Sequence, residues 1–103
     1  MGKIILDHCV EDELWAIWEY IAQDNPEAAT RVVDAVYKTF RDLLVNPGLG
    51  RVRKFRNREL RGIRSWRVSQ FENYLIFYRE LSGDIHVMHV YHGSRDLEAL
   101  FQS

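Results

Sequence analysis

The residue types best suited to chemistry in this sequence are arginines, and they are concentrated in one segment. Residues 51–67 carry eight basic side chains and one acidic side chain, a net charge of +7, with Phe55 and Trp66 among them. The guanidinium group is a planar fork of donors that matches carboxylates and phosphates. The flanking segments have net charges of −5 (residues 1–50) and −3 (residues 68–103). This asymmetry predicts an acidic or polyanionic partner, and the alternative is a basic face that meets only solvent.

Three histidines near the C-terminal end, His86, His89 and His92, offer metal-binding or proton-transfer chemistry. In a regular strand, His89 points away from the other two. His86 and His92 are then roughly 20 Å apart, too far to share an ion. We therefore predict no metal site and no cofactor, and we expect His86 and His89 to make local hydrogen bonds. His92 is the stronger functional candidate because it ends a predicted strand near Arg79 and Arg95.

A helix is predicted to begin at the N-cap residue Asp7, with acidic residues in its first turns. Its apolar positions span an arc of about 160°, with Trp15 and Ile17 at opposite edges. Such an arc is wide for one small core, so one edge is expected to remain for a partner. The alternative is that Trp15 and Trp18 both belong to the core.

A second helix is predicted to begin at Asn25-Pro26, because asparagine is a good N-cap and proline is favoured in the first turn. One apolar stripe then runs to residue 44, and residues 46–48 (Asn-Pro-Gly) end the helix. The link between the helices is short, which favours an antiparallel helical hairpin.

The rest of the chain is predicted to form strands. Residues 73–80 and 85–91 are rich in aromatic and β-branched residues and flank a Gly-containing turn, which indicates a β-hairpin. Residues 74–78 are apolar on both faces, as in a central strand covered on both sides. Residues 3–6 and 60–68 are predicted as further strands, and residues 48–57 as irregular. Residues 97–101 are predicted as a short C-terminal helix.

The order β-α-α-β-β-β predicts an α+β fold, with a helical hairpin on one face of a small, largely antiparallel sheet. At 103 residues the chain is expected to form one domain, residues 1–103. No apolar run approaches the roughly 20 residues of a membrane span, and no signal peptide is evident. Cys9 is the only cysteine, which excludes an internal disulfide and fits a cytoplasmic location. The sequence contains no Gly-rich phosphate loop and no Ser/His/Asp order typical of a hydrolase.

Several short motifs, taken in order, resemble the ParE branch of the RelE/ParE superfamily, the toxins of bacterial type II toxin–antitoxin pairs. The resemblance covers nearly the whole chain, and each motif is weak by itself. The motifs are residues 17–22 (IWEYIA), 25–29 (NPEAA), 46–47 (NP), 50–51 (GR), 60–64 (LRGIR), 74–79 (YLIFYR) and 92–96 (HGSRD).

The resemblance implies one of two activities. RelE-like members are ribosome-dependent mRNA endonucleases, whereas ParE-like members act on DNA gyrase without cutting RNA. RNA cleavage needs a base, an acid and cations for the phosphate. In that alternative the catalytic residues are Arg61, Arg79, His92 and Arg95. Lysine is nearly absent from the predicted sheet, and Phe101 stands where a terminal tyrosine is expected, which favours the gyrase inhibitor.

Both readings imply a cognate, acidic, ParD-like antitoxin that forms a hetero-oligomer with this chain, and no membrane partner. We expect the following residues to bind the antitoxin: Trp15, Trp18, Arg51, Arg53, Arg56, Arg58, Arg61, Arg64, Trp66 and Arg67. We expect the following residues to contact the target, DNA gyrase or, in the alternative, ribosomal mRNA: Arg79, His92, Arg95, Leu97, Leu100 and Phe101.

Overall fold

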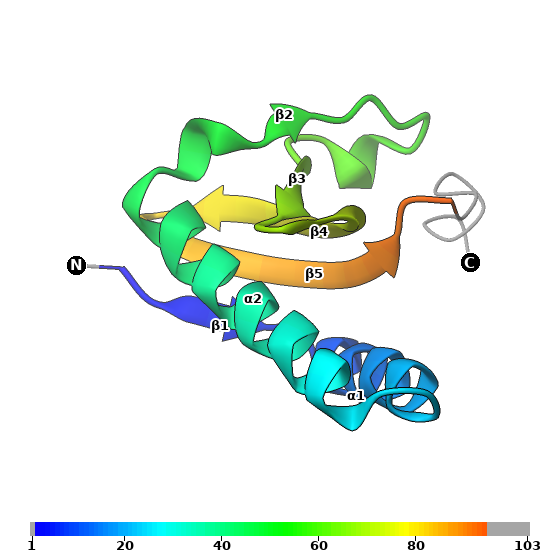
Figure 1. Cartoon of the computed structure of the whole chain (residues 1–103). Helices are drawn as coiled ribbons and strands as arrows, with labels where there is room; N and C mark the ends of the chain where they lie inside the picture. Colours follow the sequence, from blue (N-terminus) through cyan, green and yellow to red (C-terminus); the bar gives the residue numbers. More distant parts are fainter. Residues whose placement is uncertain (1, 95–103) are drawn as a thin grey trace.

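The computed structural model describes residues 2–94. Two α-helices form a hairpin on one face of a five-stranded sheet (Figure 1). The elements in chain order are β1 (Ile4–Leu6), α1 (His8–Ala22), α2 (Pro26–Val45), the 3-10 turn η1 (Pro47–Leu49), β2 (Arg51–Val52), the 3-10 turn η2 (Arg58–Leu60), β3 (Arg64–Val68), β4 (Phe71–Leu81) and β5 (Asp84–His92).

The strand order across the sheet is β1-β5-β4-β3-β2. Strand β1 runs parallel to β5, and the other neighbours are antiparallel. The predicted α+β fold with a largely antiparallel sheet is confirmed. The predicted helix over residues 97–101 lies outside the described residues.

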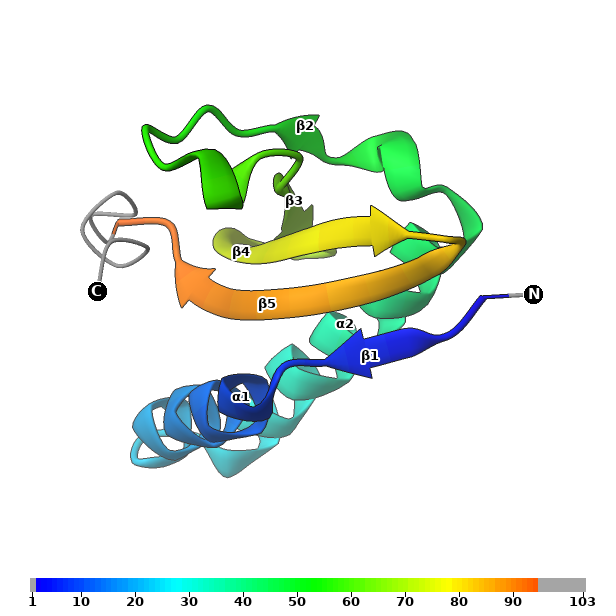
Figure 2. The ribbon, with the colours of Figure 1, turned by 180° about the vertical axis from the view of Figure 1, so that it is seen from behind.

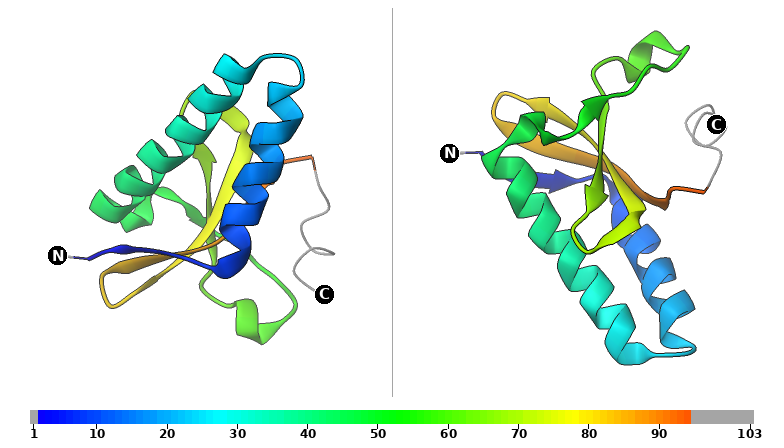
Figure 3. Two further views of the ribbon diagram at one scale, coloured as in Figure 1. Left: turned by 90° about the horizontal axis from the view of Figure 1, so that it is seen from below. Right: turned by 45° about the horizontal axis from the view of Figure 1, so that its top comes forward.

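Both helices begin where their capping residues predict. The Asp7 carboxylate accepts a hydrogen bond from the His8 N–H, and the Asn25 side chain accepts one from the Ala28 N–H. Pro26 occupies the first turn of α2, where its missing N–H costs nothing. The helices form the predicted hairpin and run back along each other from the short turn that joins them (Figure 3).

Strand β4 is buried on both faces, as the sequence predicts. Its Ile76 and Tyr78 face the helices and pack with Val36, Phe40 and other apolar residues in the main core. Phe77 points to the opposite face, where it forms a smaller cluster with Ile63 and Tyr91. Phe55 and Leu60 pack against this second cluster from the segment between β2 and β3. That segment therefore covers the sheet face that the helices leave open (Figure 2).

Residues 51 and 52 correct the prediction of an irregular segment at 48–57. They form the edge strand β2, in which Arg51 pairs with Ser65 and Val52 pairs with Arg64. A two-residue strand is too short to carry an alternation signal. Its pairing depends on where β3 lies, which is decided by tertiary contacts.

A β-bulge in β5 corrects the predicted orientation of the histidines. Phe77 pairs with His89 and Tyr78 with Val87, so that Met88 is an extra residue in β5. The extra residue reverses the alternation along the strand. Pairing places His86 and His89 on the face away from the helices and His92 on the helix face, opposite Tyr74. The prediction that His89 points away from both other histidines is therefore wrong.

Candidate functional site

The basic segment is anchored by its apolar residues and exposes most of its arginines. Ile63, Leu60 and Phe55 pack on the sheet in the second cluster. Five arginines of the segment are exposed, Arg51, Arg56, Arg58, Arg61 and Arg67, while Arg53 and Arg64 are half-buried. The apolar contacts therefore hold a cationic surface on the sheet face away from the helices.

One of the half-buried arginines has a structural role. The Arg64 Nη1 donates to the Gly50 carbonyl at 2.7 Å. The Gly50 N–H donates to the Tyr78 hydroxyl at 2.9 Å, and that hydroxyl donates to the Pro47 carbonyl at 2.6 Å. Burial raises the pKa of the Tyr78 phenol, which therefore stays neutral and donates. We call Pro47, Gly50, Arg64 and Tyr78 the Tyr78 clamp; it connects the end of α2 to the centre of the sheet.

Three arginines line a shallow groove next to Trp66. The Arg67 guanidinium carbon lies 4.4 Å from the Trp66 ring centroid, and its Nε is 3.3 Å from a Glu72 carboxylate oxygen. The Arg53 guanidinium lies 5.8 Å from the ring centroid of the buried Phe77. The groove has a volume of about 350 Å³, and Arg51 also lines it. Burial, followed by the like charge of Arg51, lowers the pKa of Arg53. An anionic group in the groove would relieve this repulsion between guanidinium groups.

A second surface lies on the helical hairpin. Trp15 is 60% exposed and stacks on Trp18, with ring centroids 5.6 Å apart. Trp18 also ties the two helices together, because its Nε1 donates to the Thr30 hydroxyl at 3.3 Å. The two rings line an apolar pocket of about 270 Å³ with Val33 and Tyr37. Of the two edges of the wide apolar arc of α1, the one at Trp15 is therefore left uncovered.

The two surfaces lie on opposite sides of the sheet. The Trp15–Trp18 pair belongs to the helical hairpin, whereas the loop with Arg56, Arg58 and Arg61 covers the other face (Figures 1 and 2). A single partner that contacts both surfaces must therefore wrap around the molecule. An extended or disordered segment can do this more readily than a rigid domain.

His92, the residue predicted to transfer protons, lies far from Arg79, one of the two arginines predicted to be near it. His92 pairs with Tyr74 and Arg79 pairs with His86, so Arg79 and His92 lie at opposite ends of the hairpin, about 17 Å apart along β4. The prediction that Arg79 lies near His92 is wrong, because Arg79 is close to the hairpin turn whereas His92 is at the far end of β5. Arg95, Leu97, Leu100 and Phe101 lie outside the described residues.

Each of the two residues makes its own local contacts. The Arg79 Nη2 donates to the Glu59 carbonyl at 2.8 Å, while its Nε is buried without a hydrogen-bond partner among the described residues. The exposed His92 lies with Nδ1 2.7 Å from the Ser94 hydroxyl, and its ring meets Tyr74 edge-on at 5.3 Å.

The sequence matches a family model over almost its whole length. The model describes the ParE toxin of the type II toxin–antitoxin system parDE, and it matches residues 4–97. The chain belongs to the ParE toxin family. Among proteins with curated functions, none matches it. Within the described part of this ParE-family chain, no helix is both long and apolar enough to cross a membrane.

Two solved structures share the fold of this ParE-family chain. One is described as the chromosomal ParDE TA system from P. aeruginosa, with a TM-score of 0.71 and 19% identity; the match covers 89% of this chain and 96% of that one. The other, a YoeB/ParE toxin from Agrobacterium tumefaciens, has a TM-score of 0.54 and 19% identity, over 87% and 96% of the two chains. At this identity the likeness shows the fold and the order of its elements.

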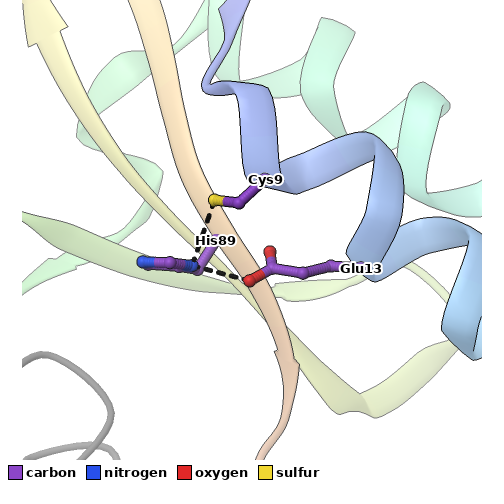
Figure 4. Close-up of side chains that lie close together, drawn as sticks. All are labelled: Cys9, Glu13 and His89. Carbon is purple, nitrogen blue, oxygen red and sulfur yellow. Dashed lines mark hydrogen bonds and ion pairs between the residues drawn. The ribbon is translucent and has the colours of Figure 1, made fainter. Parts of the chain in front are cut away.

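Sequence reasoning missed a polar cluster at the edge of the sheet, formed by Cys9, Glu13 and His89 (Figure 4). The His89 Nδ1 lies 2.7 Å from one Glu13 carboxylate oxygen and 3.6 Å from the Cys9 Sγ. Cys9 and Glu13 are four residues apart on α1 and therefore share one face of the helix. The spacing of Cys9 and Glu13 was visible in the sequence, but the proximity of His89, 76 residues after Glu13, was not.

The cluster completes the hydrogen bonding of β5 where β1 ends. The Asp7 N–H donates to the Val87 carbonyl, and within residues 2–94 no strand continues along this edge of β5 beyond that point. Instead, the Cys9 thiol donates to the Met88 carbonyl at 3.3 Å, and Glu13 accepts from the Val90 N–H at 2.9 Å. Burial, followed by the charges of Glu13 and Asp7, raises the pKa of the Cys9 thiol, which stays protonated at neutral pH. Side chains of α1 thus cover an otherwise open strand edge.

We expect Glu13→Ala to lower the free energy of unfolding by about 1–3 kcal/mol. The change leaves the Val90 N–H without its acceptor in a half-buried setting, which costs more than the loss of an exposed hydrogen bond. Urea denaturation measures the effect. The matched control is Glu19→Ala, an exposed position on the same helix, where the change should stay within about 0.5 kcal/mol. Equal effects at the two positions would contradict the assigned edge-covering role.

Proposed function

We propose that this chain is the toxin of a two-protein pair and is neutralised by a small acidic antitoxin that wraps around it. Family membership over residues 4–97 carries the proposal. The exposed arginines and the groove beside Trp66 suit the carboxylates of such a partner. The apolar pocket beside Trp15 and Trp18 suits an apolar side chain of the same partner. The separation of these surfaces favours a segment that folds on binding.

The partner is tested by expressing the chain together with its neighbouring open reading frames and purifying through a tag on this chain. We expect a small acidic protein to co-purify in a fixed ratio, and we expect growth inhibition when that neighbour is omitted. A soluble, nontoxic chain with no neighbour bound would count against the proposal.

We further propose that the cellular target is DNA gyrase. Cleavage of RNA needs a base for the 2′-hydroxyl, an acid for the leaving oxygen and cations for the phosphate. His92 is the exposed candidate for proton transfer, and Arg79 lies at the other end of the hairpin, bonded to Glu59. His89 and Glu13 are half-buried and bonded to each other. Inhibition of gyrase needs a shaped, charged surface but no acid–base pair.

We expect His92→Ala to lower toxicity by no more than about tenfold, because the change removes one exposed contact with the target and leaves the others in place. Loss of general acid–base catalysis typically costs 10²–10⁴-fold, so a nuclease that uses His92 would lose nearly all activity. Colony counts after induction without antitoxin measure toxicity. Supercoiling by purified gyrase and the integrity of cellular mRNA identify the target.

The two targets give opposite patterns in this experiment. A gyrase inhibitor should cause DNA-damage signalling and filamentous cells while mRNA initially stays intact, and it should inhibit supercoiling in vitro. Rapid codon-specific mRNA cleavage that His92→Ala abolishes would overturn the gyrase proposal and assign His92 to catalysis. Deletion of residues 97–103, which removes Leu97, Leu100 and Phe101, should abolish toxicity if these residues contact the target.

A further inference from the structure

The Cys9, Glu13 and His89 cluster has the composition of a metal-binding site. Thiolate, imidazole and carboxylate are the three ligand types that proteins use for zinc. The potential ligand atoms, the Cys9 Sγ, a Glu13 carboxylate oxygen and a His89 ring nitrogen, all lie within 4.8 Å of one another. We propose that these three side chains bind one divalent ion of the zinc type at the junction of α1 and β5 (Figure 4). This inference is independent of the proposed toxin activity.

The separation of the sulfur and the ring nitrogen already fits a tetrahedral ion. Bonds of about 2.3 Å to sulfur and about 2.0 Å to nitrogen, at a tetrahedral angle, place the two atoms about 3.5 Å apart. The observed distance from the Cys9 Sγ to the His89 Nδ1 is 3.6 Å. No movement of α1 relative to β5 is needed to bring this pair of ligands to a common ion.

The carboxylate must move slightly. The Glu13 oxygen lies 2.7 Å from the His89 Nδ1, which is a hydrogen-bond distance, whereas two ligands of a tetrahedral ion lie about 3.3 Å apart. The ion therefore takes the place of the shared hydrogen. When it binds, the Cys9 thiol releases its proton to solvent, and the neutral His89 ring carries its hydrogen on Nε2. A side-chain rotation of Glu13 supplies the change of about 0.6 Å in the distance between its oxygen and the His89 Nδ1.

Contacts outside the cluster orient all three ligands. The second carboxylate oxygen of Glu13 accepts from the Val90 N–H, and the Cys9 thiol donates to the Met88 carbonyl at 3.3 Å until it gives up its proton to bind the ion. The His89 ring stacks on Tyr91 with centroids 4.7 Å apart. The bulge at Met88 sets the position of His89 on the strand. Such supporting contacts hold ligands in place before the ion arrives.

The partial burial of the site determines how the coordination is completed, and the ligand types determine which metal the site prefers. The His89 and Glu13 side chains are 22% and 18% exposed, so water can reach the ion and complete four-coordination. A thiolate with an imidazole favours zinc and cobalt over magnesium and calcium, which prefer oxygen ligands. The sequence-based prediction of no metal site compared the histidines only with one another. This site uses one histidine and two residues from α1.

The test is a titration of the full-length chain, stripped of metal by chelation and kept reduced, with Co²⁺. We expect one equivalent to produce the visible bands of a tetrahedral ion together with a sulfur-to-cobalt charge-transfer band. Because Cys9 is the only cysteine in the sequence, that band identifies its ligand without any mutation. Zn²⁺ should displace the cobalt and raise the thermal unfolding temperature of the wild type.

Three variants locate the site. Cys9→Ser and His89→Gln should each weaken Co²⁺ binding by about 100-fold or more, because loss even of a supporting contact costs 10–100-fold. The matched control is His86→Gln on the same strand, which should bind as the wild type does. Circular dichroism of the metal-free variants checks that they are folded.

Two results would overturn the proposal. One is the absence of stoichiometric Co²⁺ binding, or of the charge-transfer band, in the wild type at micromolar concentrations. The other is binding that survives both Cys9→Ser and His89→Gln in folded protein. If either variant fails to fold, the wild-type charge-transfer band still decides between presence and absence of the site.

Discussion

Replacing Gly50 by alanine should destabilise this fold by about 3 kcal/mol or more. A Cβ at this position would lie 2.6 Å from the Tyr78 hydroxyl and 2.9 Å from the Ser65 carbonyl oxygen. The Tyr78 hydroxyl cannot retreat without losing its hydrogen bonds to Gly50 and the Pro47 carbonyl. Overpacking costs about 1–3 kcal/mol, and each buried polar group left unsatisfied costs a similar amount. Urea denaturation followed by circular dichroism measures the loss.

The reason for glycine at this position is steric and not conformational. Gly50 has φ −75° and ψ 148°, an extended conformation open to any residue. The matched control is therefore Gly48→Ala, where a Cβ would meet its nearest atom, the Asn46 Oδ1, at an ordinary 3.6 Å. This change should stay within about 0.5 kcal/mol. Similar losses for Gly48→Ala and Gly50→Ala would contradict the assignment of the Tyr78 clamp.

The destabilisation should also reach the basic surface. Gly50 immediately precedes β2, and Arg64 of β3 donates to its carbonyl. Displacement of Gly50 therefore moves Arg51 and the edge of the arginine groove. Gly50→Ala should weaken antitoxin binding even under conditions in which the chain remains folded, whereas Gly48→Ala should not.

Reversing two exposed charges, Arg58→Glu with Arg61→Glu, should weaken the antitoxin complex by about 100-fold or more. Each exposed ion pair is worth only about 0–1 kcal/mol, but reversal also places like charges against an acidic partner, at a cost of several kcal/mol. A 100-fold change corresponds to about 2.8 kcal/mol. Titration calorimetry with the purified antitoxin measures the loss of affinity. Repeating it at a second salt concentration measures how far salt screens the charge effect.

The matched control reverses Arg31 and Arg41, two exposed arginines of α2. It makes the same change in net charge and should reduce affinity by less than about fivefold, an effect that salt abolishes. Arg64 is left intact because its loss would disturb the Tyr78 clamp. Equal losses from the two double variants would show that the antitoxin senses net charge and that the loop around Arg58 is not its binding surface.

Local sequence signals were sufficient for the helices. Asp7 and Asn25 cap their helices because a short side-chain acceptor reaches the first free backbone N–H groups, an interaction within a few residues. The unbroken apolar run of residues 74–78 predicted a strand covered on both faces, and Ile76, Phe77 and Tyr78 are buried. The family motifs, which span nearly the whole chain, predicted the ParE toxin family that the match over residues 4–97 shows.

The candidate binding sites depend on contacts between residues far apart in the sequence, which local sequence patterns do not reveal. Strand β2 exists because β3 lies beside it, and the Tyr78 clamp joins residues 28 positions apart. The bulge at Met88 changes which faces the three histidines share. A prediction from strict alternation along a strand cannot show where an extra residue interrupts it.

The sequence by itself therefore determined the two helices, the longer strands, their order and the charge of the basic segment, because propensity, capping and composition act over short distances. The tertiary structure decided which side chains meet. Because β1 stops at Leu6, α1 lies along the open edge of β5, and its Cys9 and Glu13 turn toward the backbone there and toward His89. Those three residues are brought together by unsatisfied hydrogen-bonding groups at a strand edge, which exist only once the sheet has formed.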